Sequence, residues 1–384
     1  MQYFSSNFKL GILGGGQLGK MLISECAKLD IYTIVLDPSK DASCSNLASE
    51  FYVGDLMDYD TVVNFGKKAD VITIEIENVN AVALEKLESL GKKVYPSSEN
   101  IKTIQNKGLQ KLFYKENNLP TSDFKIHASL RSIEKDVLAN KLTYPFIWKS
   151  TQFGYDGKGV KIVENNDQLK KLPNLECIVE EKIKIQKELS IIVSRNKSNE
   201  ESNFPIVEME FNQQSNLVEQ VICPANITDS IRETVFEIAT KLSRSLNNIG
   251  LLAIEMFLTQ DNKVLINEIA PRPHNSGHHT IECCHTSQFE QHLRSILNLP
   301  LGDTSIKIPG IMLNLVGENK VEGDVVYENI EEVMKLPGVT LHIYGKRKSR
   351  LNRKMGHITI ANKNINDAIE LSKEIRKIIK VTAK

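Results

Sequence analysis

Short apolar segments and glycine-rich turns alternate along the first hundred residues. The apolar run 8–13 predicts a strand, and the turn 14–19 leads into a segment, 20–29, whose apolar residues recur at helical spacing. Apolar runs predict further strands at 31–36, 71–76 and 92–95, with a helix at 81–90. Strands that alternate with helices in this way favour a parallel sheet.

Later segments mix strand-like and helical patterns without any internal repeat. Amphipathic spacing predicts helices at 109–116, 228–246 and 366–380. Apolar runs predict strands at 146–149, 177–180 and 189–193, and in two runs between 251 and 269. The polar segment 194–203 is typical of a solvated hairpin loop.

The length of 384 residues corresponds to two or three packed units, because a typical domain has ~150 residues. The alternating pattern ends near residue 105, and Pro300-Leu301-Gly302 precedes the last unit. We therefore expect domains at 1–105, 106–300 and 301–384. The last one ends in a Lys-rich helix, whose charges are typical of a solvated face.

The composition narrows the class of protein. Apolar residues make up 41% and charged residues 25%, which is typical of a globular protein and excludes disorder. Lys plus Arg and Asp plus Glu both number 48, so no net field attracts nucleic acid or anionic lipid. The six cysteines have no Cys-x-x-Cys spacing and predict reduced thiols. Since no apolar run reaches the ~18 residues of a membrane span, we expect a cytoplasmic protein.

The first glycine turn has dinucleotide-binding spacing. Gly14, Gly16 and Gly19 fit Gly-x-Gly-x-x-Gly, and Asp37 follows about twenty residues later. In physical terms the pattern offers backbone amides and a helix start to an anion. A nicotinamide or flavin cofactor, another phosphorylated ligand and tight packing alone all remain open, and we favour the phosphorylated ligand.

A second glycine-rich loop follows the predicted strand that ends at Lys149. Mobile backbone amides and a lysine can together neutralise a triphosphate. The loop returns to a strand instead of a helix, which does not fit a Walker loop. The alternative is a plain hairpin turn.

The most informative segment is a predicted hairpin around residues 259–263. If Asp261-Asn262 is a two-residue turn, Glu255 faces Glu268 across the two strands. Directly opposed acids ~5 Å apart destabilise a sheet unless a cation compensates them. Mg²⁺ prefers carboxylates together with substrate phosphates, so the pair predicts a metal-bound nucleotide triphosphate.

Asn267 supplies another oxygen beside this acid pair. The alternative is an exposed sheet face on which lysines pair with the glutamates. A turn longer or shorter by one residue would also shift the strand register, so that Glu255 would no longer face Glu268. We expect apolar neighbours on the same face as the acids, namely Ala253, Phe257, Ile266 and Ala270.

A loop stiffened by two prolines follows the hairpin at 271–279 and displays Arg272 and His274, which suits a small oxyanion. Histidines and cysteines at 278–285 could instead bind zinc, but their spacing matches no zinc signature. The basic segment 346–357 is either solvated or a clamp for a phosphate.

Five motifs in these segments resemble those of the ATP-grasp superfamily, and within it of the ligases that carboxylate 5-aminoimidazole ribonucleotide in de novo purine biosynthesis. They are GGGQLGKM at 14–21, EIENV at 75–79, GYDGKG at 154–159, NEIAPRPHNSGH at 267–278 and RKMGH at 353–357. The resemblance is nearly full length. It implies an α/β and α+β fold, with a Rossmann-like N-terminal domain that binds no dinucleotide, a central two-part ATP-grasp domain and a small C-terminal domain.

The resemblance also implies the chemistry. ATP phosphorylates bicarbonate to carboxyphosphate, and the amine of 5-aminoimidazole ribonucleotide takes up the carboxyl group as a carbamate. ATP is then a co-substrate, two Mg²⁺ ions are expected, and a homodimer is expected through the resemblance alone. The rival functions are a formate-dependent ligase for glycinamide ribonucleotide, a non-catalytic nucleotide sensor and a dehydrogenase.

Residues are carried over from the resemblance by position. For ATP they are Lys107, Lys149, Gly154, Tyr155, Asp156, Gly157, Lys158, Gly159, Val160, Glu180, Glu181, Lys182, Ile183, Glu188, Asn267 and Glu268. For Mg²⁺ they are Glu255, Asn267 and Glu268. For the aminoimidazole nucleotide they are Gln17, Glu75, Tyr155, Lys158, Arg350 and Lys354. The catalytic group is Arg272, His274, Lys354 and Tyr155, with Arg272 and His274 on bicarbonate.

Three positions depart from the family pattern. Phe153 stands where a glycine usually precedes Gly154, Lys158 stands where some relatives have arginine, and Phe211 stands where a histidine often contacts the nucleotide. Lysine keeps the charge of arginine but loses its bidentate fork. The metal-binding acids are retained, so we interpret the departures as tuning of activity.

Overall fold

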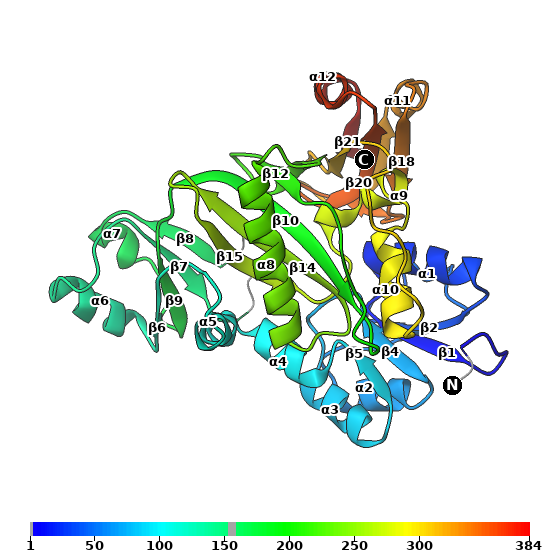
Figure 1. Cartoon of the computed structure of the whole chain (residues 1–384), viewed down its shortest axis with the longest axis horizontal. Helices are drawn as coiled ribbons and strands as arrows, with labels where there is room; N and C mark the ends of the chain where they lie inside the picture. Colours follow the sequence, from blue (N-terminus) through cyan, green and yellow to red (C-terminus); the bar gives the residue numbers. More distant parts are fainter. Residues whose placement is uncertain (1–2, 153–158) are drawn as a thin grey trace.

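The N-terminal part of the chain forms a five-stranded parallel sheet (Figure 1). The sequence predicts the parallel sheet and four of its strands, but not the strand at 50–53. The structure is a computed structural model, and it describes residues 3–152 and 159–384. The strand order is β3-β2-β1-β4-β5, with β1 (Lys9–Leu13), β2 (Tyr32–Asp37), β3 (Glu50–Val53), β4 (Val71–Ile74) and β5 (Lys93–Tyr95).

Helices cover both faces of this sheet. On one face, α1 (Gln17–Lys28) packs Leu22 and Cys26 against the central strands, together with α10 (Gln288–Ile296). On the other face lie α2 (Tyr59–Gly66), α3 (Ala81–Ser89) and α4 (Ser98–Gln105). This two-sided cover explains why the central strands β1 and β4 are almost fully buried instead of alternating between buried and exposed residues.

A separate four-stranded sheet forms a lobe at the left of Figure 1. Its order is β6-β9-β7-β8, with β6 (Phe124–His127), β7 (Phe146–Ser150), β8 (Val160–Val163) and β9 (Cys177–Glu181). Two helices pack on it through Ile133 and Leu169, namely α6 (Leu130–Leu138) and α7 (Asn166–Leu169). The antiparallel β7–β8 pair confirms that the second glycine loop joins two strands.

The largest sheet continues from the middle of the chain into its C-terminal part. Its path is β15-β14-β10-β12-β13-β16-β20-β18, with β11 beside β10. The strands from the middle of the chain are β10 (Ile185–Arg195), β11 (Glu201–Asn203), β12 (Val207–Phe211), β13 (Val218–Cys223), β14 (Gly250–Thr259) and β15 (Val264–Ala270). The later strands are β16 (Gly310–Val316), β18 (Val339–Ile343) and β20 (Lys354–Ala361).

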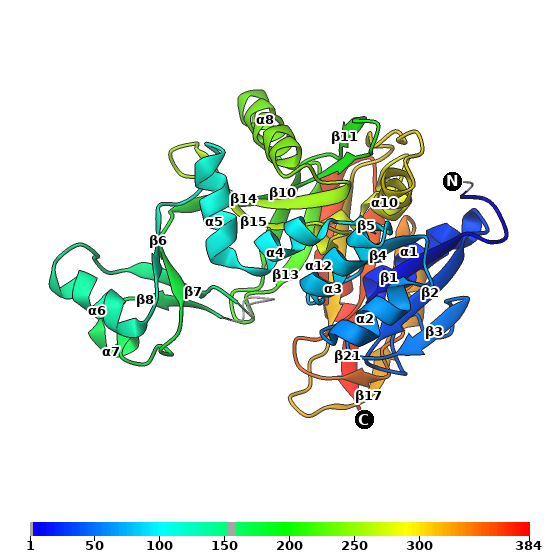
Figure 2. The same ribbon diagram turned by 90° about the horizontal axis from the view of Figure 1, so that it is seen from below.

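Helix α8 (Asp229–Ser245) covers one face of this sheet (Figure 2). Thr228 caps it by accepting the N–H of Ile231, and its buried apolar residues recur at helical spacing at 231, 235, 238 and 242. They pack on Ile254 and Met256 of β14. Side chains alternate along a strand, so Glu255 points to the opposite face.

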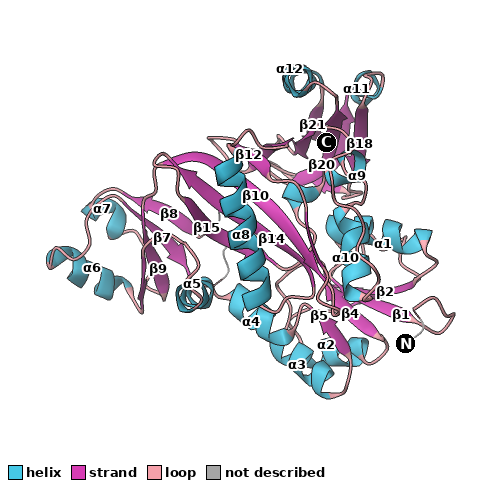
Figure 3. Ribbon diagram, viewed as in Figure 1, coloured by secondary structure: helices cyan, strands magenta, loops and turns pink. Residues whose placement is uncertain are grey.

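The C-terminal part adds a small sheet and two helices to the large sheet (Figure 3). The small sheet has the order β19-β17-β21, with β17 (Gly323–Glu328), β19 (Lys348–Ser349) and β21 (Lys380–Ala383). The helices are α11 (Ile330–Met334) and α12 (Ile365–Ile378). In the described part of the chain, no helix is long and apolar enough to cross a membrane.

The β14–β15 hairpin differs from the prediction at its turn. The N–H of Thr259 donates to the carbonyl of Lys263 at 2.9 Å, so residues 260–262 form a three-residue loop. Asn262 takes a left-handed conformation with φ 61°, which asparagine tolerates. The expected two-residue turn is therefore wrong, and near the turn Met256 pairs with Ile266.

A β-bulge at Asn267 then restores the predicted pairing of Glu255 with Glu268. The extra residue breaks the alternation of β15, so Asn267 and Glu268 lie on one face between Ile266 and Ile269, which both pack in the α8 core. The prediction that Ile266 shares the face of the acids is wrong for this reason. Ala253 and Ala270 do pack together.

Candidate active site

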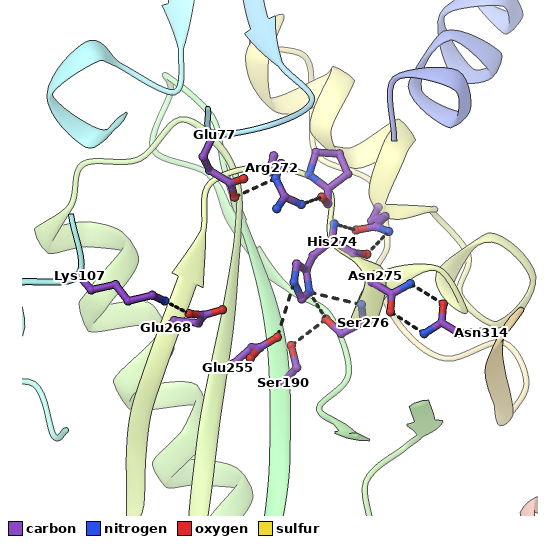
Figure 4. Close-up of polar contacts among 12 residues, drawn as sticks. Glu77, Lys107, Ser190, Glu255, Glu268, Arg272, His274, Asn275, Ser276 and Asn314 are labelled. Carbon is purple, nitrogen blue, oxygen red and sulfur yellow. Dashed lines mark hydrogen bonds and ion pairs between the residues drawn. The ribbon is translucent and has the colours of Figure 1, made fainter. Parts of the chain in front are cut away.

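The two opposed acids have different surroundings (Figure 4). The Glu268 side chain is 45% exposed and forms an ion pair with Lys107, the first residue of α5 (Lys107–Glu116). The positive charge of Lys107 lowers the pKa of Glu268. The Glu255 side chain is only 16% exposed, and burial together with the charge of Glu268 raises its pKa. The pair therefore holds one carboxylate and one carboxyl that resists ionisation until a cation arrives.

A second lysine reaches the hairpin from the four-stranded sheet. The ammonium of Lys149 donates to Asn267 Oδ1 at 3.1 Å and lies 3.2 Å from Glu180 Oε2. Glu180 is buried and is also 3.4 Å from Lys111, whose pKa burial lowers to about 8. Glu180 thus orients Lys149 toward the bulge, and the carboxylate itself faces two lysines.

The proline-flanked loop places a guanidinium and an imidazole above the acids. Arg272 Nε is 2.8 Å from Glu77 Oε1, and His274 Nε2 is 3.6 Å from Glu255 Oε1. His274 Nδ1 accepts the N–H of Ser276 at 3.3 Å, so the ring proton of the neutral imidazole is on Nε2. Burial, Arg272 and Lys354 lower the pKa of His274 to about 3. His274 is therefore a neutral donor that points at Glu255.

Carboxylates of the chain occupy the first glycine turn. Asp37 accepts the N–H of Gly15 at 2.7 Å, and Glu75 accepts the N–H of Leu18 at 3.1 Å at the start of α1. A side chain at Gly16 would collide with the Glu75 carboxylate. Amides that would bind a pyrophosphate in a dinucleotide site are thus satisfied from within the chain.

Two lysines of the C-terminal part face the same region. Burial raises the pKa of Glu75, and the charges of Arg272 and Lys346 oppose this rise. The charge of Lys354 acts in the same way on Glu255. Lysines of α5 and β7, Arg272 of the proline loop and two lysines of the C-terminal part therefore bring positive charge to one region. The acid pair in this region can hold a hard metal ion. Such an arrangement can bind and align several anions.

Family models match three successive parts of the chain. A ribonucleotide synthetase preATP-grasp domain matches residues 8–105, an ATP-grasp domain matches 112–289, and a phosphoribosylaminoimidazole carboxylase C-terminal domain matches 310–371. Similar sequences agree. N5-carboxyaminoimidazole ribonucleotide synthase of Bacillus subtilis is 36% identical, with 91% of this chain and 90% of that protein covered. The chain belongs to the N5-carboxyaminoimidazole ribonucleotide synthase family.

Other relatives of the synthase family are longer than this chain. The chloroplastic phosphoribosylaminoimidazole carboxylase of Vigna aconitifolia is 37% identical over 93% of this chain. The match covers 64% of the plant protein, so the chain spans less than two thirds of its length.

Solved structures of the synthase family share the whole fold. The synthetase of Thermotoga maritima has a TM-score of 0.90 at 39% identity, covering 98% of this chain and all of the other. The synthase of Aspergillus clavatus in complex with ADP and 5-aminoimidazole ribonucleotide has a TM-score of 0.85 at 31% identity, covering 96% and 99%. The predicted fold class and family are confirmed.

The structure gathers most of the residues that the synthase resemblance assigns. Contacts or charges join residues of the hairpin, the proline loop, helix α5, strands β7, β9 and β20, and the segment after β4: Lys107, Lys149, Glu180, Glu255, Asn267, Glu268, Arg272, His274, Glu75 and Lys354. Glu188 lies on β10 on the face of Glu255, and burial raises its pKa to about 7. Gln17 begins α1 in the same turn as Leu18, and Gly159 and Val160 end the glycine loop.

Other assigned residues lie elsewhere or outside the described residues. Arg350 is exposed, and among the described residues it pairs with Glu322 at 4.0 Å. Glu181, the last residue of β9, and Lys182 after it are exposed, and Ile183 is half-buried. Phe211 packs at the edge of an apolar cluster with Val218. The remaining positions, Phe153, Gly154, Tyr155, Asp156, Gly157 and Lys158, lie outside the described residues.

Sequence reasoning missed several functional neighbours. Glu77 is in the EIENV motif and pairs with Arg272, while Lys346 is in the basic segment and acts on Glu75. Lys111 follows Lys107 by one helical turn, which was the available signal for its shared face. In the basic segment, Lys346 and Lys354 are half-buried and their charges act on Glu75 and Glu255, whereas Arg347 and Lys348 are exposed. Part of the segment is therefore solvated, and the phosphate clamp stays a prediction.

Proposed function

We propose that the chain uses ATP to carboxylate the amine of 5-aminoimidazole ribonucleotide with bicarbonate, giving N5-carboxyaminoimidazole ribonucleotide, ADP and phosphate. The observation that carries the proposal is the opposed pair Glu255 and Glu268, with Lys107 and Lys149 beside it and the Arg272 loop above it. The related Aspergillus clavatus structure with ADP and 5-aminoimidazole ribonucleotide supports the same pair of ligands here.

ATP is proposed to lie between the four-stranded sheet and the β14–β15 hairpin. Lys149 of β7 already contacts Asn267 of β15, so the two walls meet at the position where a triphosphate would need cations. The segment 180–183 would carry the adenine and Glu188 the ribose. The loop 154–160 would cover the phosphates, and the boundaries 1–105, 106–300 and 301–384 remain part of this proposal.

The donor set of the hairpin fits Mg²⁺. Glu255, Glu268 and Asn267 offer only oxygen ligands on one face, which suits a hard cation that also takes phosphate oxygens. Among the described residues no three His, Cys, Asp or Glu side chains form a metal site by themselves, so phosphate and water would complete the coordination. When bound, Mg²⁺ supplies charge neutralisation for the triphosphate, and two ions are proposed.

The proline loop is proposed to hold bicarbonate and then carboxyphosphate. A bicarbonate oxygen attacks the γ-phosphorus and ADP leaves; the amine nitrogen then attacks the carboxyl carbon and phosphate leaves. Arg272 supplies positive charge for these anions, and the neutral His274 donates its Nε2–H without adding a second charge. Both would act chiefly by alignment and by stabilising developing negative charge.

The aminoimidazole nucleotide is proposed to lie between the first sheet and the C-terminal lysines. Glu75 offers a carboxylate beside Gln17, and Lys346 and Lys354 offer charge for the nucleotide phosphate. Tyr155, Lys158 and Arg350 stay in the proposal by resemblance alone. All six cysteines are buried free thiols, which supports the proposed cytoplasmic location, and a homodimer is proposed from the resemblance.

ADP release with each combination of acid and amine tests the proposed function. The purified chain is given ATP and Mg²⁺ with bicarbonate or formate, and with 5-aminoimidazole ribonucleotide or glycinamide ribonucleotide. We expect release that requires bicarbonate together with 5-aminoimidazole ribonucleotide. Release only with formate and glycinamide ribonucleotide would overturn the proposal.

A further inference from the structure

The backbone of His274 is held by one side chain, that of Gln288. The N–H of His274 donates to Gln288 Oε1 at 2.8 Å, and Gln288 Nε2 donates to the His274 carbonyl at 2.8 Å. Gln288 is fully buried at the start of α10. The backbone N–H requires an oxygen opposite it, so the orientation of the amide is fixed.

This double contact replaces a missing strand neighbour. His274 has extended dihedrals, φ −129° and ψ 155°, but it lies beyond the end of β15 and outside the sheet ladders. The amide of Gln288 gives it the donor and acceptor that an adjacent strand would supply. Gly277 permits the approach, because a Cβ there would stand 2.5 Å from Gln288 Oε1.

The backbone contact determines where the imidazole points. With the His274 peptide fixed, the N–H of Ser276 donates to His274 Nδ1 and holds the ring on that side. The Ser276 hydroxyl lies 2.8 Å from the Ser190 hydroxyl (Figure 4). These contacts leave the Nε2–H directed at Glu255. The other N–H of Gln288 lies 3.1 Å from His278 Nδ1, so the Gln288 amide has little freedom to rotate.

We propose that Gln288 is a positioning residue that aligns His274 with the Glu255 end of the acid pair. The inference rests on the proposed function, because it assigns Gln288 a part in the carboxylation step. Gln288 touches no proposed substrate and acts only through His274.

Gln291 of the same helix is a matched control. It is also fully buried, and it holds the backbone of Gly302 in the same two-sided way: the Gly302 N–H donates to Gln291 Oε1 at 2.8 Å, and Gln291 Nε2 donates to the Gly302 carbonyl at 3.3 Å. Gly302 begins the segment that leads into the C-terminal part and has no proposed contact with a substrate. The two glutamines therefore differ mainly in the backbone that they bind, which is that of His274 for Gln288 and that of Gly302 for Gln291.

The test compares Gln288→Glu with Gln291→Glu. Each change keeps the side-chain size and the acceptor but removes the donor and sets a carboxylate against a carbonyl oxygen. For Gln288→Glu we expect kcat to fall by about 10²-fold, the effect of a misplaced group, with the KM for ATP nearly unchanged. For Gln291→Glu we expect a similar loss of stability to urea with kcat retained. Gln288→Asn, which shortens the side chain but keeps both donor and acceptor, gives the same comparison if Gln288→Glu does not fold.

A readout without turnover separates this inference from the proposed function. In the substrate-free protein labelled with ¹⁵N-histidine, the ring nitrogens of His274, assigned with His274→Asn, should shift in Gln288→Glu and stay in place in Gln291→Glu. Unchanged His274 signals in Gln288→Glu, or equal losses of kcat in both variants, would overturn the positioning role. If the unaltered chain instead shows no bicarbonate-dependent ADP release, the proposed function fails while the His274 measurement still decides the geometry.

Discussion

Glu255 faces Glu268 across the β14–β15 ladder, although the turn between the strands is one residue longer than a two-residue turn. The bulge at Asn267 offsets the longer turn. It also brings the Asn267 amide to the face of the acids, where the amide binds Lys149. The bulge therefore sets the chemistry of the site as well as its register.

Removing either charge of the acid pair should abolish turnover. We expect Glu255→Gln and Glu268→Gln to lower kcat by at least about 10²-fold, since each removes a preorganised metal-binding charge. The fold, checked by circular dichroism, should be retained. Asp261→Asn is the matched control, because Asp261 is an exposed acid of the same hairpin, and its described partners, Lys263 and Thr259, both belong to the turn region. Near-normal rates in both glutamine variants would contradict the metal assignment.

Without metal, the buried acid should make stability fall as the pH rises. Burial and Glu268 raise the pKa of Glu255 above its unfolded value, so the folded chain binds a proton that the unfolded chain releases. This contribution is complete below the unfolded pKa and is lost as the pH rises through the folded pKa. Urea unfolding with a chelator should show that Glu255→Gln gains stability over the unaltered chain at pH 9 but not at pH 4. If the two proteins differ in stability by the same amount at pH 9 and at pH 4, the pKa of Glu255 is not raised in the folded chain.

Deleting Asn267 should remove its side-chain amide from the site while keeping the pairing of Glu255 with Glu268. Without the extra residue, the register set by the turn continues along β15, and the glutamate that follows still pairs with Glu255. We expect the deletion to fold, yet to raise the KM for ATP about tenfold, because the charged Lys149 loses its hydrogen bond to the Asn267 amide, a contact worth about 1.5 kcal/mol. Asn267→Ala should show the same rise. A deletion that leaves the KM unchanged while Asn267→Ala raises it would argue against this explanation.

Gly16→Ala should affect one substrate selectively. Gly16 caps α1 with φ −75°, so alanine brings no backbone strain, but its Cβ would collide with the Glu75 carboxylate. Displacing Glu75 should raise the KM for 5-aminoimidazole ribonucleotide and leave the KM for ATP unchanged. Steady-state kinetics with each substrate varied in turn checks this. A parallel rise in both constants would indicate a general loss of structure.

His274→Ala should impair carboxylation and leave ATP binding intact. Because burial, Arg272 and Lys354 lower the pKa of His274 to about 3, the imidazole is neutral above that pH and contributes no ionisation to the rate between pH 6 and 9. Calorimetric titration with ATP and Mg²⁺ should give the same affinity as for the unaltered chain. Weakened ATP binding would place His274 in the nucleotide site.

The sequence predicts the parts of this protein that depend on local pattern. The parallel first sheet follows from apolar runs that alternate with helical spacing, and the glycine loop after Lys149 joins two strands as expected. The prediction of a two-residue turn at Asp261-Asn262 is wrong, because asparagine tolerates the left-handed conformation in loops of more than one length. The pairing of Glu255 with Glu268 was nevertheless correct, because a bulge that no pattern signals offsets the error.

The supporting residues could not be predicted because tertiary structure brings them together. Glu77 and Arg272 are far apart in the sequence, and so are Lys346 and Glu75. Gln288 lies in an ordinary helix start, where its contact with the His274 backbone leaves no mark in the pattern. Glu180 stays a proposed adenine contact, and no local pattern indicates that its buried carboxylate also pairs with Lys111 and Lys149.

The fate of the bicarbonate oxygens tests the central claim most directly. With ¹⁸O-labelled bicarbonate, ATP, Mg²⁺ and 5-aminoimidazole ribonucleotide, the released phosphate is examined by ³¹P NMR. If a bicarbonate oxygen attacks the γ-phosphorus and departs with it, one ¹⁸O per turnover appears in inorganic phosphate. Phosphate that carries no ¹⁸O, formed at the same rate as ADP, would contradict phosphorylation of bicarbonate at this site.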